Sequence, residues 1–139
     1  MEGVRPILLV EDNPMDVDLT RRAFARRKVV NPIQVTRDGE EALACIARWE
    51  SGAATPVVIL LDLKLPRVDG LEVLKQIKHH PQFKMIPIVV LTSSAEDRDV
   101  QAAYQLGVNS YIVKPVDFEK FLEVAAQIDL YWNVLNTPP

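Results

Sequence analysis

The sequence predicts an α/β fold in which helices cover both faces of a five-stranded parallel sheet, a doubly wound arrangement. Short apolar segments alternate five times with longer stretches of helical period, which is typical of successive βαβ units. The segment 57–61 is apolar throughout, as expected for a central parallel strand that is buried on both faces. With 139 residues, of which 48% are hydrophobic and 25% charged, the chain suits one domain with a single core.

Turn and capping residues bound the first strand and the first helix. We expect a strand at 6–10 and a helix that begins at Asn13 and Pro14, because proline suits the first helical position. The apolar contacts of this helix come from Val17, Leu19 and Phe24. Asn31 and Pro32 are expected to end it.

The second strand is expected at 33–36, and Asp38 and Gly39 form the turn into the second helix. The apolar stripe of this helix consists of Ala42, Leu43, Ile46 and Trp49. Ser51 and Gly52 end the helix, and the third strand follows at 57–61.

The third helix stops before Pro81, because the residue that precedes a proline disfavours the helical conformation. Its apolar stripe consists of Leu71, Val73, Leu74 and Ile77. The remaining elements are expected as a strand at 88–91, a helix at 95–106, a strand at 110–113 and a helix from 117 to near 136. Gly107 marks the C-terminal stop of the fourth helix.

Four of the predicted strands end on a reactive polar group. The apolar runs at 8–10, 58–61, 88–91 and 111–113 are followed by Glu11 with Asp12, by Asp62, by Thr92 and by Lys114. The carboxyl ends of parallel strands meet at one edge of an open sheet. These side chains are therefore expected to converge on one crevice.

This set of residues predicts phosphoryl chemistry. Glu11, Asp12 and Asp62 would repel one another unless a hard cation lay between them, and Mg²⁺ prefers such oxygen ligands. Asp62 is the central carboxylate and can act as a nucleophile toward phosphorus, forming an aspartyl phosphate. Lys114 would pair with a phosphoryl oxygen, and Thr92 would offer a hydroxyl donor.

The motifs around these residues resemble those of the receiver domains of two-component response regulators, over essentially the whole chain. They are VEDN at 10–13, LDLKLP at 61–66 with DG at 69–70, LTS at 91–93 and YIVKP at 111–115. The hydroxyl residue follows the aspartate by 30 positions (92 − 62 = 30) and the lysine follows by 22 more (114 − 92 = 22), which agrees with the family. Asp69 with Gly70 also suits an ordinary start of a helix, which is the interpretation we favour.

The resemblance implies a flavodoxin-like receiver fold with strand order 2-1-3-4-5 and five helices. It implies that Asp62 is phosphorylated and that Asp12 and Asp62 ligate Mg²⁺ directly, whereas Glu11 acts mostly through water. Lys64 would contribute its backbone carbonyl to the metal. The protein would accept and slowly lose its own phosphoryl group, without turnover of an external substrate.

The resemblance also implies a switch driven by phosphorylation. Thr92 would move toward the phosphoryl group, Tyr111 would turn inward, and Lys114 would pair with the new charge. The surface that changes shape consists of the predicted helix at 95–106, the strand at 110–113 and the helix at 117–136. A cis peptide bond between Lys114 and Pro115 is a further expectation.

Three features are most similar to small stand-alone regulators that are paired with bacterial phytochrome histidine kinases. They are the Asn31 and Pro32 element, the turn and helix start at 38–43, and the aromatic residues near the C-terminus. We therefore expect a single receiver domain at 1–139 with an extended C-terminal helix and no output domain. The expected partners are a sensor histidine kinase and a downstream protein that the sequence does not name.

The last helix indicates a surface for protein contact. Its core-facing stripe consists of Phe118, Phe121, Leu122, Ala125, Ile128, Trp132 and Leu135. Val124, Leu130 and Tyr131 lie off this stripe and predict spare apolar surface, which favours a homodimer through the switch surface. The alternative is that a long helix covers the core more completely.

The first helix is the expected docking site of the kinase, by analogy with the family. The residues that would contact the kinase are Met15, Asp16, Leu19 and Arg22. A solvated helix face is the alternative. A basic cluster follows at Arg21, Arg22, Arg26, Arg27 and Lys28, which suits solubility or the steering of an acidic partner.

Composition argues against several other classes of protein. The net charge of −3 and the pI near 5.4 do not provide the broad positive field that nucleic-acid binding requires. No run approaches the roughly 20 apolar residues of a membrane span. Cys45 alone cannot form an intrachain disulfide, so the cytoplasm is the expected compartment. His79 and His80 lack a matching ligand pair at zinc spacing and are expected to be structural.

Three other functions are alternatives to phosphoryl transfer. A dehalogenase-like phosphatase needs an acid two residues after its nucleophile, where this chain has Lys64. A flavodoxin-like cofactor binder needs a loop rich in glycine or hydroxyl residues for a permanent phosphate, and the sequence has none. The remaining alternative is a receiver-like binding module that works without phosphorylation.

Overall fold

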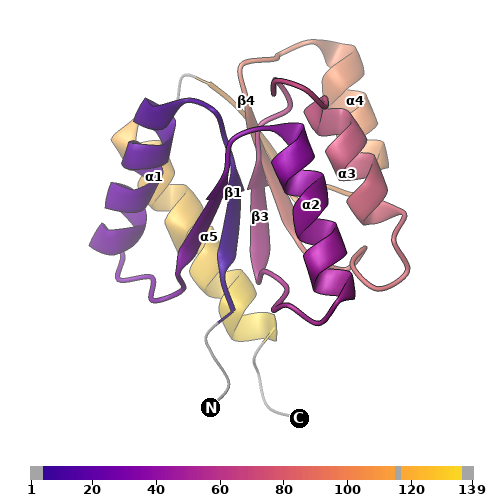
Figure 1. Cartoon of the computed structure of the whole chain (residues 1–139). Coiled ribbons are helices and arrows are strands. Elements are labelled where there is room, and N and C mark those ends of the chain that lie inside the picture. Colours follow the sequence, from indigo (N-terminus) through magenta and orange to yellow (C-terminus); the bar gives the residue numbers. More distant parts are fainter. Residues whose placement is uncertain (1–4, 115–116, 136–139) are drawn as a thin grey trace.

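Five parallel strands alternate with five helices along the chain (Figure 1). The computed structural model describes residues 5–114 and 117–135, and residues 129–135 by their backbone alone. The strand order is β2-β1-β3-β4-β5, which confirms the predicted doubly wound fold. The elements are β1 (Ile7–Val10), α1 (Pro14–Arg26), β2 (Ile33–Thr36), α2 (Gly39–Glu50), β3 (Val58–Leu61), α3 (Gly70–Lys78), β4 (Ile88–Thr92), α4 (Asp97–Gln105), β5 (Ser110–Val113) and α5 (Phe118–Leu135).

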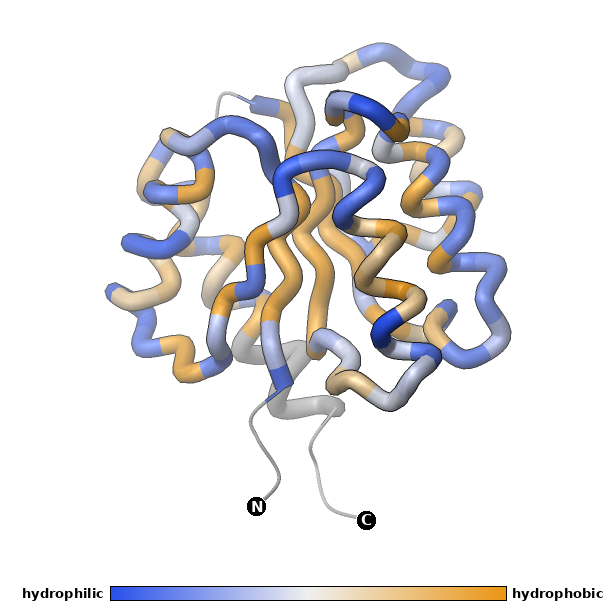
Figure 2. The backbone as a smooth tube through the Cα atoms, in the orientation of Figure 1, coloured by the Kyte–Doolittle hydropathy of each residue, from blue (hydrophilic) through white to orange (hydrophobic). Residues whose placement is uncertain are grey.

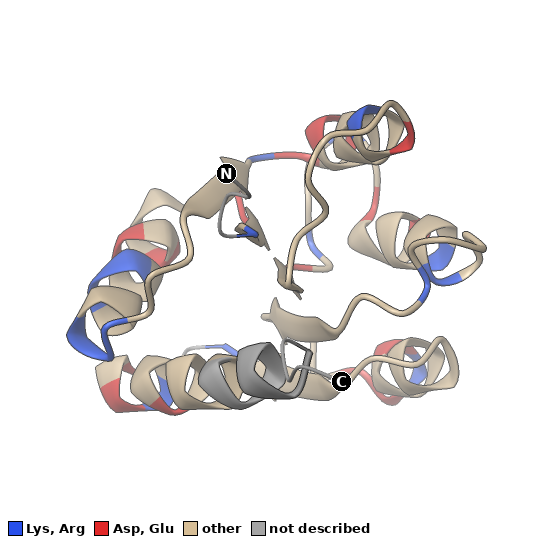
Figure 3. Ribbon diagram, turned by 90° about the horizontal axis from the view of Figure 1, so that it is seen from below, with Lys and Arg blue, Asp and Glu red and all other residues tan. Residues whose placement is uncertain are grey.

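The sheet is the middle of three layers. Viewed along the sheet, α1 and α5 lie together on one side, and α2, α3 and α4 lie on the other (Figure 3). The strands β1, β3 and β4 are buried along their whole length, whereas β2 and β5 form the partly exposed edges. This arrangement explains why the central strands are uninterrupted apolar runs, which the hydropathy colouring of Figure 2 shows.

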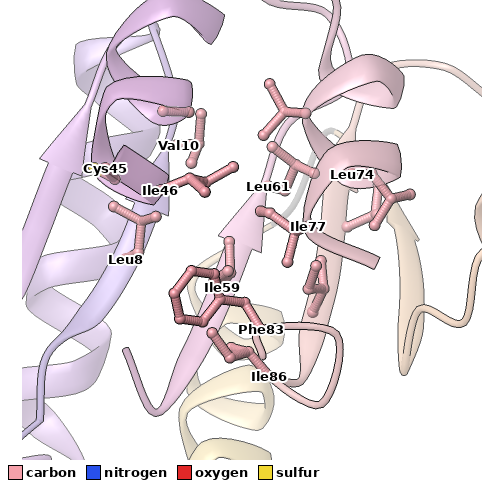
Figure 4. Close-up of a cluster of buried hydrophobic side chains, with 14 of the residues drawn as sticks. Leu8, Val10, Cys45, Ile46, Ile59, Leu61, Leu74, Ile77, Phe83 and Ile86 are labelled. Atoms are coloured by element: carbon pink, nitrogen blue, oxygen red, sulfur yellow. The ribbon is translucent and has the colours of Figure 1, made fainter. Parts of the chain in front are cut away.

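Successive residues of the central strands supply two separate cores. Leu8 and Ile59 face α2 and α3, whereas Leu9 and Leu60 face α1 and α5. Figure 4 shows the first of these cores, in which strand side chains meet those of α2, α3 and the segment before β4. Because both faces of β1, β3 and β4 are buried, neither face of these strands tolerates a polar residue, so their polar groups are confined to the strand ends.

The starts of α1 and α2 agree with the sequence and have side-chain caps, whereas α4 begins at Asp97, two residues later than expected. The Asn13 side chain accepts a hydrogen bond from the backbone N–H of Met15 at 2.9 Å, and Asp38 accepts one from Glu41 at 2.8 Å. One helix end differs from the expectation. α1 ends at Arg26, ahead of Asn31 and Pro32, because Lys28 adopts a left-handed backbone with φ of 59°.

The prediction that Val124 adds spare apolar surface is wrong. Its side chain is 1% exposed and belongs to the same core as Phe121, Ala125 and Ile128. The physical reason is that α5 packs against both the sheet and α1, so its buried face is wider than a single stripe. The side chains of Leu130 and Tyr131, like those of Trp132 and Leu135, lie outside the described residues.

Two residues with reactive side chains have structural roles. Cys45 is buried in the core, and burial raises the pKa of its thiol, which disfavours the reactive thiolate. The His80 ring stacks on Phe83 and its Nε2 lies 3.1 Å from the Glu50 carboxylate.

None of the described helices is both long enough and apolar enough to cross a lipid bilayer.

Gly70 begins α3 as expected, and its lack of a side chain is a packing requirement. A Cβ at this position would lie 2.4 Å from the carbonyl oxygen of Asp62 and 2.5 Å from the Cα of Leu63. The Gly70 N–H also donates to the Leu63 carbonyl at 3.0 Å. The start of α3 is therefore packed directly on the backbone that carries Asp62.

We expect Gly70→Ala to lower the free energy of unfolding by about 2–3 kcal/mol, because the added methyl group overlaps backbone atoms that cannot move independently. Chemical denaturation measures this change. Alanine is otherwise a better helix former than glycine. Lys75→Ala, at an exposed position of the same helix, is the control and should change stability by less than about 0.5 kcal/mol. Equal effects of the two substitutions would contradict the packing argument.

Candidate functional site

Backbone hydrogen bonds hold the polar residues that follow the strands. The N–H of Glu11 donates to the carbonyl of Thr36 at 2.9 Å, and the N–H of Asp62 donates to that of Val10 at 3.0 Å. The N–H of Lys114 donates to the carbonyl of Thr92 at 2.7 Å. Parallel pairing therefore continues one residue past the strands and fixes the first residue of each loop at the same edge of the sheet.

The ammonium group of Lys114 is the centre of the site. Its Nζ lies 2.7 Å from Glu11 Oε1, 2.9 Å from Asp62 Oδ2 and 2.9 Å from Asp16 Oδ2. Its side chain is 13% exposed, and that of Glu11 is 2% exposed. An ammonium has three N–H donors, so these three carboxylates match its full capacity.

The charges of this cluster shift the pKa values of its members. Burial would lower the pKa of Lys114, but hydrogen bonds to Asp16, Glu11 and Asp62 outweigh burial and raise it, so the ammonium stays charged. Burial raises the pKa of the Glu11 carboxyl to about 7, and the nearby charge of Asp62 adds to this effect, whereas Lys114 opposes it. Two carboxylates, those of Glu11 and Asp62, are buried beside one ammonium, so this part of the site has an excess of negative charge.

Glu11, Asp12 and Asp62 form a group that fits a divalent metal ion. One carboxylate oxygen of each lies within 4.8 Å of the other two. Glu11 and Asp62 are buried, whereas Asp12 is exposed, so water can complete the coordination from the open side. The carbonyl ligand from Lys64 stays a prediction; its N–H donates to Asp62 Oδ1 at 2.9 Å, which places that backbone beside the acidic group.

The hydroxyl and aromatic residues belong to a second, connected network. Thr92 is fully buried, and its Oγ1 accepts a hydrogen bond from the N–H of Ser94 at 3.4 Å. The Tyr111 hydroxyl donates to the Ser94 carbonyl at 2.8 Å, and the Ser94 hydroxyl donates to Asp99 Oδ2 at 2.5 Å. The Lys64 ammonium lies 3.9 Å from the same Asp99 oxygen. The loop after β4 is thus attached to α4, to β5 and to the loop after β3.

Two residues of these networks were not assigned to the site from the sequence. Asp16 was expected on the surface that contacts a kinase, but its carboxylate is turned toward Lys114 and is 18% exposed. Asp16 lies in the first turn of α1, directly after the loop that carries Glu11. This closeness to Glu11 along the chain was the sequence feature that could have assigned Asp16 to the site. Asp99 lies in the first turn of α4, where only the packing of Ser94 against it shows its role.

The other residues of α1 that were expected to contact a kinase differ in their exposure. Met15 is exposed, Leu19 is half-buried, and Arg22 pairs with Asp18 at 3.0 Å on the surface of α1. The expected cis bond before Pro115 lies outside the described residues. The four strand-end residues Glu11, Asp12, Asp62 and Lys114 are brought together as predicted, and Thr92 ends the neighbouring strand.

The fold and this edge of the sheet define a flavodoxin-like α/β protein whose strand ends carry carboxylates and a lysine rather than a glycine-rich phosphate loop. The chain belongs to the response regulator receiver domain family, whose model matches residues 7–126.

Individual relatives agree with this family assignment. The probable methanogenesis regulatory protein FilR2 of Methanothrix harundinacea is 45% identical over 134 residues, which cover 96% of this chain and 86% of FilR2. The crystal structure of phosphorylated RcpA, a cyanobacterial phytochrome response regulator, is 38% identical, has a TM-score of 0.81 and covers 99% of this chain and 98% of its own. The Mn²⁺-bound form of response regulator Rcp1 is 36% identical, has a TM-score of 0.80 and covers 97% of both chains.

We expect Lys114→Met to lower the free energy of unfolding by about 3 kcal/mol at neutral pH, because Glu11 and Asp62 would be left as buried carboxylates without a cation. Denaturant titration measures this loss. Glu11→Gln in the same chain should recover part of it. Lys120→Met removes an exposed pair with Glu123 and should cost less than about 1 kcal/mol. A Lys114 variant as stable as the wild type would contradict the proposed charge balance.

We expect divalent cations to raise the melting temperature of the wild-type protein, because they bind the acidic group of the folded state. At a concentration of 100 times the dissociation constant, the stabilisation is about 2.7 kcal/mol. Differential scanning calorimetry with MgCl₂ and MnCl₂ measures the shift. Asp12→Asn should reduce it strongly, whereas Asp18→Asn, on the exposed face of α1, should leave it unchanged. Equal shifts in both variants would exclude the acidic group as the metal site.

Proposed function

We propose that this protein accepts a phosphoryl group from a sensor histidine kinase onto Asp62, in a reaction that depends on Mg²⁺. The observation that carries the proposal is the 2.9 Å contact between Asp62 Oδ2 and Lys114 Nζ beside the acidic group of Glu11, Asp12 and Asp62. Such a group combines, at one edge of the sheet, a carboxylate that can act as a nucleophile, a cation beside it and carboxylate oxygens that suit a metal ion. The phosphorylated state of RcpA and the Mn²⁺-bound state of Rcp1 support the same chemistry by similarity.

In the proposed step, a carboxylate oxygen of Asp62 forms a bond to phosphorus as the P–N bond to the kinase histidine breaks and the imidazole leaves. Both Asp62 oxygens accept hydrogen bonds, from Lys64 N–H and from Lys114, which orient the carboxylate. Lys114 is placed to pair with an oxygen of the incoming group. A magnesium ion held by Glu11, Asp12 and Asp62 would supply positive charge for the phosphoryl oxygens.

The network of Thr92 and Ser94 gives the proposed signal a route to the surface. Thr92 would exchange its contact with the Ser94 N–H for one with the phosphoryl group. Ser94 is bonded to Asp99 on α4 and to Tyr111 on β5, so a shift of this loop changes the surface formed by α4, β5 and α5. This is a two-state element that is biased by a local change of charge.

Two surfaces are proposed for protein partners. The kinase would approach the open side of the crevice beside α1, where Met15 is exposed. A second copy of the chain, or the downstream protein, would contact the surface of α4, β5 and α5, where Tyr104 and Val113 are exposed apolar groups. A bacterial phytochrome is the proposed kinase on the similarity to RcpA, although the name of FilR2 connects a relative of similar identity to a different process.

A second candidate function is a binding module that works without phosphorylation. The charged residues disfavour it, because buried carboxylates with excess negative charge are costly unless the site binds a cation. No turnover of an external substrate is proposed for either function.

We expect the wild-type protein to gain the mass of one phosphoryl group when it is incubated with acetyl phosphate and MgCl₂, because Lys114 lies 2.9 Å from Asp62 and its positive charge offsets that of the incoming group. Mass spectrometry of the intact protein measures the gain. Chelation of the metal should abolish it, and Asp62→Asn should not be modified. Asp38→Asn, at a capping residue of α2, is the control and should be phosphorylated like the wild type. Equal gains in the wild type and Asp62→Asn would overturn the assignment and favour a different acceptor.

A further inference from the structure

Asp16 is the carboxylate that contacts Lys114 without belonging to the group that fits a metal ion. Lys114 Nζ contacts Glu11, Asp62 and Asp16 at 2.7, 2.9 and 2.9 Å. Glu11 and Asp62 belong to the acidic group that fits a metal ion, and Asp16 does not belong to that group. A cation held there would compete with Lys114 for Glu11 and Asp62, whereas Asp16, which lies outside that group, would keep its contact with Lys114.

The proposed phosphorylation would weaken the contact between Lys114 and Asp62 further. An acyl phosphate forms on Asp62, and the carboxylate charge that Lys114 faces at 2.9 Å moves onto the phosphoryl oxygens. Asp16 is bonded to neither phosphorus nor metal in this scheme. Among the contacts of Lys114 that the described residues show, the one with Asp16 is therefore the contact that can persist through every step.

We propose that Asp16 is the positioning residue of Lys114: it anchors the ammonium at the mouth of the crevice while Glu11 and Asp62 turn to the metal and the phosphoryl group. This role rests on the proposed function of Asp62. It extends the functional site from the strand ends to the first turn of α1, since Asp16 follows the Asn13 cap and Pro14 within that turn.

The placement of Asp16 on a capped helix makes it a fixed anchor. Asn13 caps the start of α1 through its hydrogen bond to the Met15 N–H, so the backbone around Asp16 is held in place. The Asp16 carbonyl also accepts a hydrogen bond from the Thr20 hydroxyl at 2.7 Å. A charge-assisted hydrogen bond from such a position limits the rotation of a long lysine side chain. Asp18, two residues further, instead points to solvent and pairs with Arg22.

Hydrogen exchange of the Lys114 ammonium, measured by ¹⁵N–¹H NMR and assigned with Lys114→Arg, tests the anchor directly. In the wild type, the exchange should be slow with and without MgCl₂. In Asp16→Asn, it should stay slow without the metal, because Glu11 and Asp62 still hold the ammonium, and become about tenfold faster with MgCl₂. Asp18→Asn makes the same change of charge on the same helix and should match the wild type in both conditions. Equal exchange in Asp16→Asn and the wild type with MgCl₂ would overturn the proposal.

The rate of phosphorylation by acetyl phosphate at saturating MgCl₂ provides the second measurement. Asp16→Asn should slow the reaction about tenfold, and Asp16→Glu, which keeps the carboxylate, should recover most of the rate. An unchanged rate in Asp16→Asn, or no recovery in Asp16→Glu, would contradict a positioning role. A wild type that is not phosphorylated at all would contradict the proposed function instead, and the ammonium exchange would still decide whether Asp16 anchors Lys114.

Discussion

The contact of one lysine with three carboxylates joins four separate parts of the chain. Lys114 follows β5, Glu11 follows β1, Asp62 follows β3, and Asp16 lies in α1. Each of these carboxylates would be costly to bury alone, because a charge without a partner loses its hydration without compensation. The ammonium offsets this cost only at the point where the strand ends meet. The strand order and the position of Lys114 therefore depend on each other.

The burial of β1, β3 and β4 explains why the charged residues of the site lie at the carboxyl ends of the strands. Side chains of β1, β3 and β4 pack into a core on each face of the sheet, so there is no exposed face on which a polar group could be placed. A shift of one residue in the pairing of β1 with β3 would move Asp62 away from Val10 and separate the carboxylates. The packing of Gly70 on the backbone of Asp62 fixes the loop on the other side. Core packing and site geometry are thus set by the same register.

The sequence was sufficient to predict features that depend on local pattern. The parallel strands, their polar ends, the helix start at Asn13 and Pro14 and the turn at Asp38 and Gly39 all depend on residues that are close together along the chain or on the general geometry of parallel sheets. The contacts of Asp16 and Asp99 could not be predicted in this way, because both residues lie on helix turns where several directions suit a polar side chain. Val124 was misassigned for a related reason: the width of the buried face of α5 depends on α1, which is about a hundred residues away in sequence. The side-chain partners between distant elements follow from packing rather than from periodicity.

The two networks have unequal charge, and this difference suggests how a local event reaches the surface. The site around Lys114 has more carboxylates than cations, and burial already raises the pKa of Glu11 to about 7, so any added positive charge is strongly favoured there. In the network around Ser94, the Ser94 hydroxyl joins the loop after β4 to the Asp99 carboxylate, and the Lys64 ammonium lies near the same carboxylate. Lys64 also belongs to the loop of Asp62, since its N–H donates to Asp62 Oδ1. In the proposed switch, a change of charge on Asp62 would act on α4 from two directions, through Thr92 and Ser94 on one side and through Lys64 and Asp99 on the other.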